Sequence, residues 1–196
     1  MGTRFFLSSS RAYSHRSCRS CECVCLVRRW ARYLRSLPQE RILVIGTGGL
    51  GHDPRVLFPP IDEVEEKWLP YHLHGRAQNQ VSQQEWIDYE IEAHHVAAAF
   101  LADDSIPDEV FGLHDDWDST FMKIFCTGDM SAFDHWKPSE VVDAAGIGAM
   151  EVLSWIAAGA TLRMLADVTP DCRLQRVCRE IGIGFGITSS GPVPIT

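Results

Sequence analysis

The chain has 196 residues, of which 45% are hydrophobic and 22% are charged. This length and composition allow one globular domain with its own core, and they exclude a fibrous or wholly disordered chain. No run of 18 or more apolar residues occurs, so the sequence predicts no membrane-spanning helix and we expect a soluble domain.

The net charge of -8 is unevenly distributed along the chain. Residues 1–35 contain eight arginines and a single acid, Glu22, whereas the remainder is strongly acidic. An acidic surface repels phosphate backbones, so we expect no nucleic-acid partner for the main domain.

Residues 1–26 are rich in Arg, Ser and Cys and show neither a helical nor a strand period. Such a composition is typical of an organellar transit peptide, and equally of an unrelated segment joined to a domain. The sequence therefore predicts a disordered leader at residues 1–26 and a folded domain at residues 27–196, which we expect to be cytoplasmic.

Four of the seven cysteines lie within that leader, at Cys18, Cys21, Cys23 and Cys25. A structural zinc site is an alternative interpretation, but such a site usually adds a second ligand pair shortly afterwards, and the next cysteine is Cys126. The cysteines also lack the even spread of a secreted disulfide framework, which favours a reducing compartment.

The first predicted elements are an amphipathic helix at 27–37, a short β-branched strand at 41–45 and a glycine-dense turn at 46–52. Three prolines then favour loop conformation, because proline lacks the amide donor and restricts its neighbours. They are Pro54, Pro59 and Pro60.

Helices are predicted within 76–102, after the acidic segment 114–118, from Pro138 and over about 149–165, with a last strand at 181–188. Gly128 is predicted to end the second of these helices. Strands among helices predict an α/β fold, here a partial α/β sheet domain with a carboxyl-terminal helical segment.

The glycine turn formally matches the dinucleotide fingerprint GxGxxG through Gly46, Gly48 and Gly51. That fingerprint needs a helix to begin at once, so that its first amides meet the pyrophosphate. Here His52, Asp53 and Pro54 follow. A dinucleotide-binding enzyme is one alternative function, and a helix starting at Leu50 would support it.

As the heptad GTGGLGH, residues 46–52 resemble the turn of class III extradiol ring-cleavage dioxygenases of the protocatechuate 4,5-dioxygenase beta-like superfamily, whose usual form is G-(S/T)-G-G-(L/M)-S-H. The chain departs from that form by Gly51 in place of serine. The resemblance implies that His52 is the catalytic acid and base beside a bound catechol. A catechol hydroxyl must lose a proton during ring cleavage, and histidine titrates near neutrality.

A second stretch, 116–158, is similar to the helical carboxyl-terminal region of the same family, in the branch acting on 2,3-dihydroxyphenylpropionate-like catechols. Within it, AMEVLSWI at 149–156 matches the segment whose glutamate completes a two-histidine, one-carboxylate iron site. The resemblance implies that Glu151 is a ligand of Fe(II), the cofactor, and that Trp117 and Asp118 line the substrate region. Without it, His52 is a turn residue and Glu151 and Asp118 are helix-start acids.

The two iron-binding histidines of the family have no recognisable counterpart in the sequence. His15 lacks the proline of the family context, and we interpret the later histidines as surface or loop residues. These are His72, His74, His94, His95, His114 and His135. Because such sites rely on three protein ligands, we expect a chain truncated relative to the family and inactive alone.

The resemblance implies that the substrate is a catechol together with O2, in aromatic-compound catabolism. It also implies a homo-oligomer or association with a homologous subunit. A different class remains open, in which the chain is a non-catalytic remnant or a structural subunit bound to a full-length homologue.

Overall fold

The computed structural model describes residues 4–7, 20–37, 42–55, 57–74 and 81–191, with side chains from residue 27 onward. Helices and strands alternate along these residues, with short 3-10 turns between them. They are β1 (Arg4–Leu7), α1 (Ser20–Arg35), β2 (Leu43–Gly46), α2 (Leu69–His74), α3 (Gln83–Leu101), α4 (Asp115–Cys126), α5 (Pro138–Ala145), α6 (Val152–Ala166), β3 (Asp171–Cys178) and β4 (Ile183–Ser189). The predicted α/β class is confirmed.

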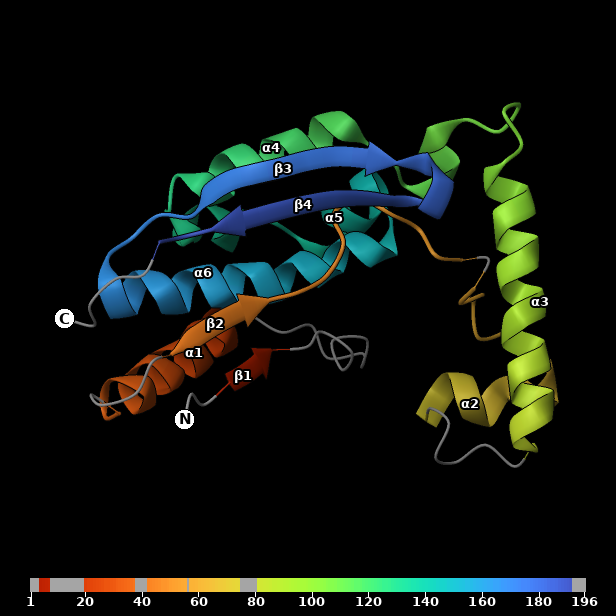
Figure 1. The fold of residues 1–196 in the computed structure, drawn as a ribbon, viewed down its shortest axis with the longest axis horizontal. Coiled ribbons are helices and arrows are strands. Elements are labelled where there is room, and N and C mark those ends of the chain that lie inside the picture. The colour runs from red at the N-terminus through yellow and green to blue at the C-terminus, as the bar shows by residue number, and fades with distance from the viewer. Residues whose placement is uncertain (1–3, 8–19, 38–41, 56, 75–80, 192–196) are drawn as a thin grey trace.

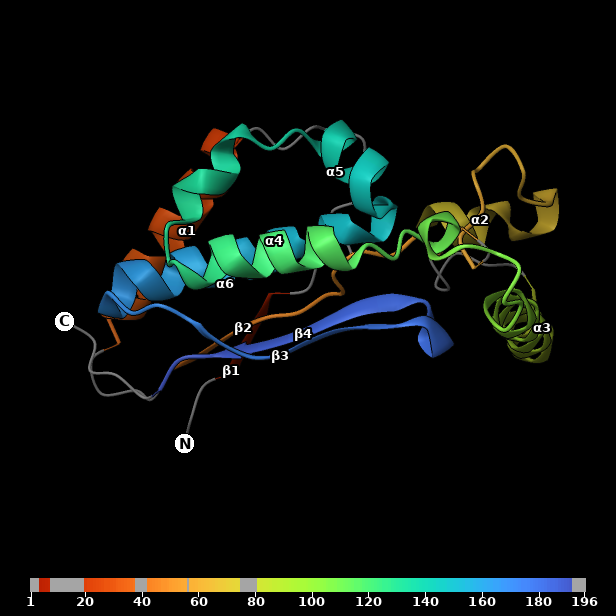
Figure 2. The same ribbon diagram turned by 90° about the horizontal axis from the view of Figure 1, so that it is seen from above.

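The strands form two small pairs on one side of the molecule (Figures 1 and 2). β1 and β2 are parallel, with Arg4 opposite Leu43, whereas β3 and β4 form an antiparallel hairpin. Two backbone hydrogen bonds join the turn after β2 to β4: Leu50 N–H donates to the Gly184 carbonyl at 2.8 Å, and Gly184 N–H donates to the Gly51 carbonyl at 2.7 Å. The glycine turn is therefore held against the hairpin.

Helices α1, α4, α5 and α6 cover one face of these strands (Figure 2). The main core lies between α4, α6 and the glycine turn, where Phe121 and Leu50 are fully buried. Its other buried members are Met122, Phe125, Phe133, Val152 and Trp155. Burying several aromatic side chains in one cluster supplies the largest hydrophobic contribution, at about 25 cal/mol per Å² of apolar surface.

The stretch Ile147–Ala166 has 20 residues and a mean hydropathy of 1.2, enough by length and composition to cross a membrane. In the structure it is a 3-10 turn followed by α6, which packs against α1 and β2 and buries Trp155, Thr161 and Leu165. A core helix has the same apolar composition, and this packing accounts for it.

Local signals in the sequence explain where several helices start and stop. Asp115, Asp116 and Asp118 occupy the first turn of α4, where negative charge is favourable, and Gly128 follows its end with φ of 78°. Pro138 opens α5, as predicted. The predicted start of the long helix at 149 was early, because Ile147–Glu151 forms a 3-10 turn before α6 begins.

Other elements were missed or misplaced by the sequence. α1 begins at Ser20 rather than at residue 27, and β1 lies within the segment for which no strand was expected. β3 carries arginines and exposed polar residues, so it lacks the apolar run that would mark a strand, and its pairing with β4 defines it. The boundary between leader and domain at residue 26 stays a prediction.

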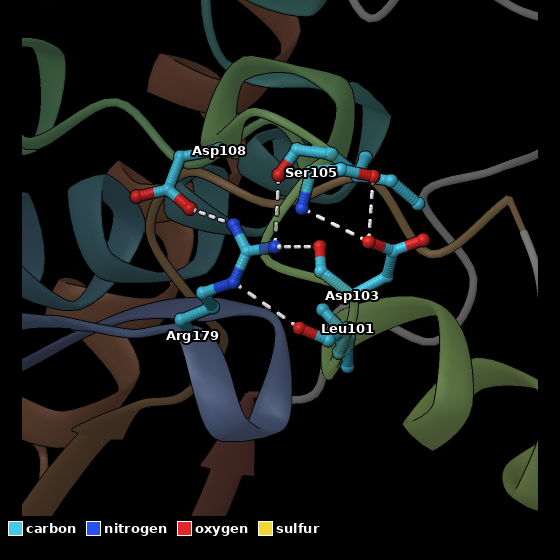
Figure 3. Close-up of polar contacts among 6 residues, drawn as sticks. Leu101, Asp103, Ser105, Asp108 and Arg179 are labelled. Atoms are coloured by element: carbon cyan, nitrogen blue, oxygen red, sulfur yellow. Dashed lines mark hydrogen bonds and ion pairs between the residues drawn. The ribbon is translucent and has the colours of Figure 1, made fainter.

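Arg179, in the turn between β3 and β4, fastens the hairpin to the chain that follows α3 (Figure 3). Its Nε donates to the Leu101 carbonyl at 3.1 Å, and its Nη2 donates to the carbonyls of Asp103 at 2.9 Å and Ile106 at 2.8 Å. The guanidinium also pairs with the Asp108 carboxylate. One planar side chain thus satisfies three carbonyls beyond the end of a helix.

We expect Arg179→Ala to lower the free energy of unfolding by about 2 kcal/mol, because three carbonyls and a carboxylate lose a charged donor. Chemical denaturation would measure this. Arg173→Ala is the matched control, since Arg173 in β3 is exposed and its side chain bonds to the exposed groups of Asp171 and Ser189. Equal effects of the two substitutions would contradict the anchoring role.

Candidate functional site

The site is the irregular turn that follows β2. β2 ends at Gly46, and no helical element begins until Glu66 among the residues that the structure describes. Two side chains of α6 hold the start of the turn: Trp155 Nε1 donates to the Gly48 carbonyl at 3.1 Å, and Ser154 Oγ donates to the Thr47 carbonyl. The turn is therefore positioned by tertiary contacts rather than by regular secondary structure.

Two carboxylates from different elements accept hydrogen bonds from the glycine amides of this turn. Glu151 Oε2 accepts from Gly49 N at 2.7 Å, and Asp118 Oδ1 accepts from Gly51 N at 2.7 Å. Both distances are at the short end expected for charge-assisted bonds. The turn thus lies between the end of the 3-10 turn before α6 and the first turn of α4.

His52 follows directly and is 8% exposed. Its backbone is fixed on both sides, because its N–H donates to the Ala145 carbonyl at 2.9 Å and its carbonyl accepts from Gly148 N–H at 3.0 Å. Its Nδ1 lies 2.9 Å from the Leu50 carbonyl oxygen. A carbonyl only accepts, so this contact assigns the proton of the neutral ring to Nδ1 and leaves Nε2 as an acceptor.

The imidazole ring lies against Gly148 with no room for a larger residue. A Cβ at Gly148 would lie 2.2 Å from His52 Nε2, and a Cβ at Gly49 would lie 2.8 Å from His52 Cε1. The same Gly49 amide binds Glu151. The structure therefore brings His52 and Glu151 to the two sides of one glycine, as the predicted site requires.

Asp118 is fully buried, although it lies in the first turn of a surface helix. Only one of its oxygens has a partner, and Oδ2 has no hydrogen bond. Burial raises the pKa of this carboxyl from 3.8 to about 7; the Gly51 amide acts in the opposite direction and the charge of Asp115 adds to the rise. A carboxyl that titrates near neutrality therefore binds the residue that precedes His52.

Trp117 lies on the α5 side of α4. Its ring stacks on Phe121 with centroids 5.9 Å apart and lies 5.7 Å from the ring of Trp136. With Trp136, Glu140 and Val141 it lines an open pocket. The substrate-binding role expected for Trp117 and Asp118 stays a prediction.

The sequence did not single out Gly148 or Gly184, whose missing side chains make room for the site. A Cβ at Gly184 would lie 2.0 Å from Asp118 Oδ2. The available signal was the interruption of apolar segments by glycine at 146–148 and 182–186. That signal marks close approach of two backbones or groups, but it does not say which group approaches.

The geometry disfavours the dinucleotide alternative. No helix begins at Leu50, and the amides of residues 49, 50 and 51 already donate to Glu151, the Gly184 carbonyl and Asp118. A pyrophosphate needs free amides at a helix start, and two carboxylates in the same place would repel it.

A complete metal centre is not formed by the residues whose positions are described: none of them make a group of three or more His, Cys, Asp or Glu side chains able to hold an ion. Glu151 contributes one carboxylate, already hydrogen-bonded to Gly49. A stable ferrous site needs about three protein ligands, so these residues do not fit the ion by themselves. The cysteine cluster at 18–25 lies outside the described side chains.

Comparison with known proteins supports the extradiol resemblance. No family model matches the chain. Proteins named 2,3-dihydroxyphenylpropionate/2,3-dihydroxicinnamic acid 1,2-dioxygenase are similar to it: that of Mycobacterium sp. (strain MCS) is 32% identical over 159 residues, 81% of this chain and 48% of the relative. The protein of Rhodococcus globerulus is 30% identical over 153 residues, 77% of this chain and 46% of the relative.

The chain is thus homologous, over about four fifths of its length, to proteins named as dioxygenases of a catecholic acid. It spans about half the length of the curated relatives it matches. The match supports a dioxygenase-like protein with a small-molecule substrate and O2.

We expect Gly148→Ala to displace the His52 ring, because the added methyl would overlap Nε2. The ring nitrogen resonances of His52 in ¹⁵N NMR should shift and the midpoint of thermal unfolding should fall. Gly191→Ala is the matched control, since a Cβ at Gly191 meets nothing within 4 Å. Unchanged His52 resonances in a folded Gly148→Ala protein would contradict the packing.

We expect the Asp118 carboxyl to make stability fall as the pH rises from about 4 to about 7. Its pKa is raised to about 7 in the folded state, so the folded chain binds the proton more tightly than the unfolded chain in this window. The slope is at most about 1.4 kcal/mol per pH unit. Denaturation across this range should give a flatter profile for Asp118→Asn than for Asp116→Asn, and identical profiles would refute the assignment.

Proposed function

We propose that this chain is a class III extradiol ring-cleavage dioxygenase of the protocatechuate 4,5-dioxygenase beta-like superfamily, acting on a catechol of the 2,3-dihydroxyphenylpropionate kind in aromatic-compound catabolism. The observation that carries the proposal is the juxtaposition of His52 and Glu151 at Gly49, on a turn whose sequence resembles the family motif. Homology to dioxygenases named for that substrate supports it.

In this proposal His52 is the proton-transfer group. Its Nδ1 is held by the Leu50 carbonyl, so Nε2 carries the lone pair that accepts a proton from a catechol hydroxyl. The ring is 8% exposed and its backbone is fixed on both sides. Little reorganisation is then needed when the proton moves, which favours general base catalysis.

The proposed cofactor is Fe(II), with Glu151 as its carboxylate ligand. When bound, such an ion supplies redox chemistry with O2 that no side chain provides. The described residues do not complete its site, so the further ligands of the proposal come from outside them, from a homologous subunit or another part of the polypeptide. We propose association with a homologous subunit on this ground, and the predicted cytoplasmic location stays a proposal.

A second candidate is a non-catalytic subunit that associates with a full-length homologue. The observation that favours it is the absence of a three-ligand metal group among the described residues. It shares the fold and the homology with the first proposal, and it differs in assigning His52 no role in proton transfer.

The experiment combines the purified chain with a full-length relative, such as the Rhodococcus globerulus protein, in which the histidine matching His52 is replaced by alanine. After anaerobic Fe(II) addition, 2,3-dihydroxyphenylpropionate and air are supplied and the yellow ring-fission product is followed. We expect colour with the wild-type chain and at least a roughly 100-fold lower rate with His52→Ala or Glu151→Gln.

Two further arms separate the candidates. The chain alone should retain no iron and give no colour, and colour from it would show that its own residues complete the site. A complex that forms without restoring colour at any ratio would favour the non-catalytic subunit. Asp116→Asn is the control chain, because Asp116 is exposed in the first turn of α4 and belongs to no proposed site.

A further inference from the structure

We infer that Asp118 is a positioning residue for His52, holding the peptide of Gly51 so that the histidine ring keeps its orientation and its Nδ1–H form. The inference deepens the proposed function and rests on it for the role of His52. Its geometry is independent of catalysis, and so is its test.

The contact between Asp118 and the turn is direct and local. Asp118 Oδ1 accepts from Gly51 N at 2.7 Å, and Gly51 is the residue between Leu50 and His52. The Leu50 carbonyl, which binds His52 Nδ1 at 2.9 Å, belongs to the same peptide unit as the Gly51 amide. Fixing that amide therefore fixes the direction of the carbonyl that selects the histidine tautomer.

The carboxylate sits in a socket built by glycines from two other elements. A Cβ at Gly184 in β4 would lie 2.0 Å from Oδ2, and a Cβ at Gly51 would lie 3.0 Å from Oδ1. The two backbone bonds between Gly184 and residues 50 and 51 bring these glycines together. α4, β4 and the glycine turn thus enclose a single side chain at the point where the turn reaches His52.

Helix packing alone does not explain this arrangement. Asp118 is fully buried and its Oδ2 has no hydrogen-bond partner, which is unfavourable for a carboxylate. Its neighbours in the same helical turn, Asp115 and Asp116, are exposed and supply the charge that favours the helix start. The distinct contribution of Asp118 is the bond to Gly51.

The test compares Asp118→Ala with Asp118→Asn, which retains an acceptor oxygen, and with Asp116→Ala as the matched control. In the wild-type chain, ¹⁵N NMR should show the Nδ1–H form of neutral His52. Asp118→Ala should give a mixture of the two tautomers and at least a roughly 10-fold faster exchange of the Gly51 amide, because that amide loses its acceptor. Asp118→Asn and Asp116→Ala should keep the Nδ1–H form.

A folded Asp118→Ala chain with an unchanged His52 tautomer and Gly51 exchange rate would overturn the inference. If that variant does not fold, Asp118→Asn measured at about pH 8 decides, where the wild-type carboxyl is ionised. Its neutral oxygen binds the amide more weakly than a carboxylate, so Gly51 should exchange about 5-fold faster than in the wild type. Equal rates would overturn the inference.

These readouts separate the inference from the proposed function. If His52 and Gly51 respond as expected while the complementation assay gives no colour, the positioning role stands and the catalytic role of His52 fails. If the assay gives colour, Asp118→Ala should lower kcat more than it raises KM, because the defect lies in orienting the reacting group.

Discussion

The arrangement depends on one constraint, which is that the backbone amides of the glycine turn must find partners although the turn is neither helix nor strand. Buried amides without partners are strongly unfavourable, and here side chains and a strand supply them. Glu151 binds Gly49, Asp118 binds Gly51 and the Gly184 carbonyl binds Leu50. α4, α6 and β4 are thereby fixed around one short segment, and His52 is placed at its end.

This solution places two carboxylates close to the core, and the aromatic cluster offsets the resulting loss. Phe121 and Trp155 come from α4 and α6, the helices that lie next to the two acids, and their rings contact each other with centroids 6.1 Å apart. The same packing that buries apolar surface therefore sets the distance between the carboxylates and the turn. Proteins commonly retain locally unfavourable groups where function requires them.

The site is half of a chemistry rather than a whole one. It offers a histidine held in one tautomer beside a carboxylate, which is what proton transfer next to a metal requires. The described residues do not supply the remaining ligands of an iron centre. The proposed catechol chemistry consequently involves residues beyond those described, and the chain spans about half the length of its relatives.

The sequence by itself determined the α/β class, the strand before the glycine turn and the starts of α4 and α5, because charge, proline and glycine act locally at element ends. It also marked His52 and Glu151 through the resemblance. Only the tertiary structure decided that Asp118 is buried on Gly51, that Gly148 receives the His52 ring and that β3 is a strand. Each of these depends on a partner about 65 to 100 residues away or on cross-strand pairing, which local patterns do not specify.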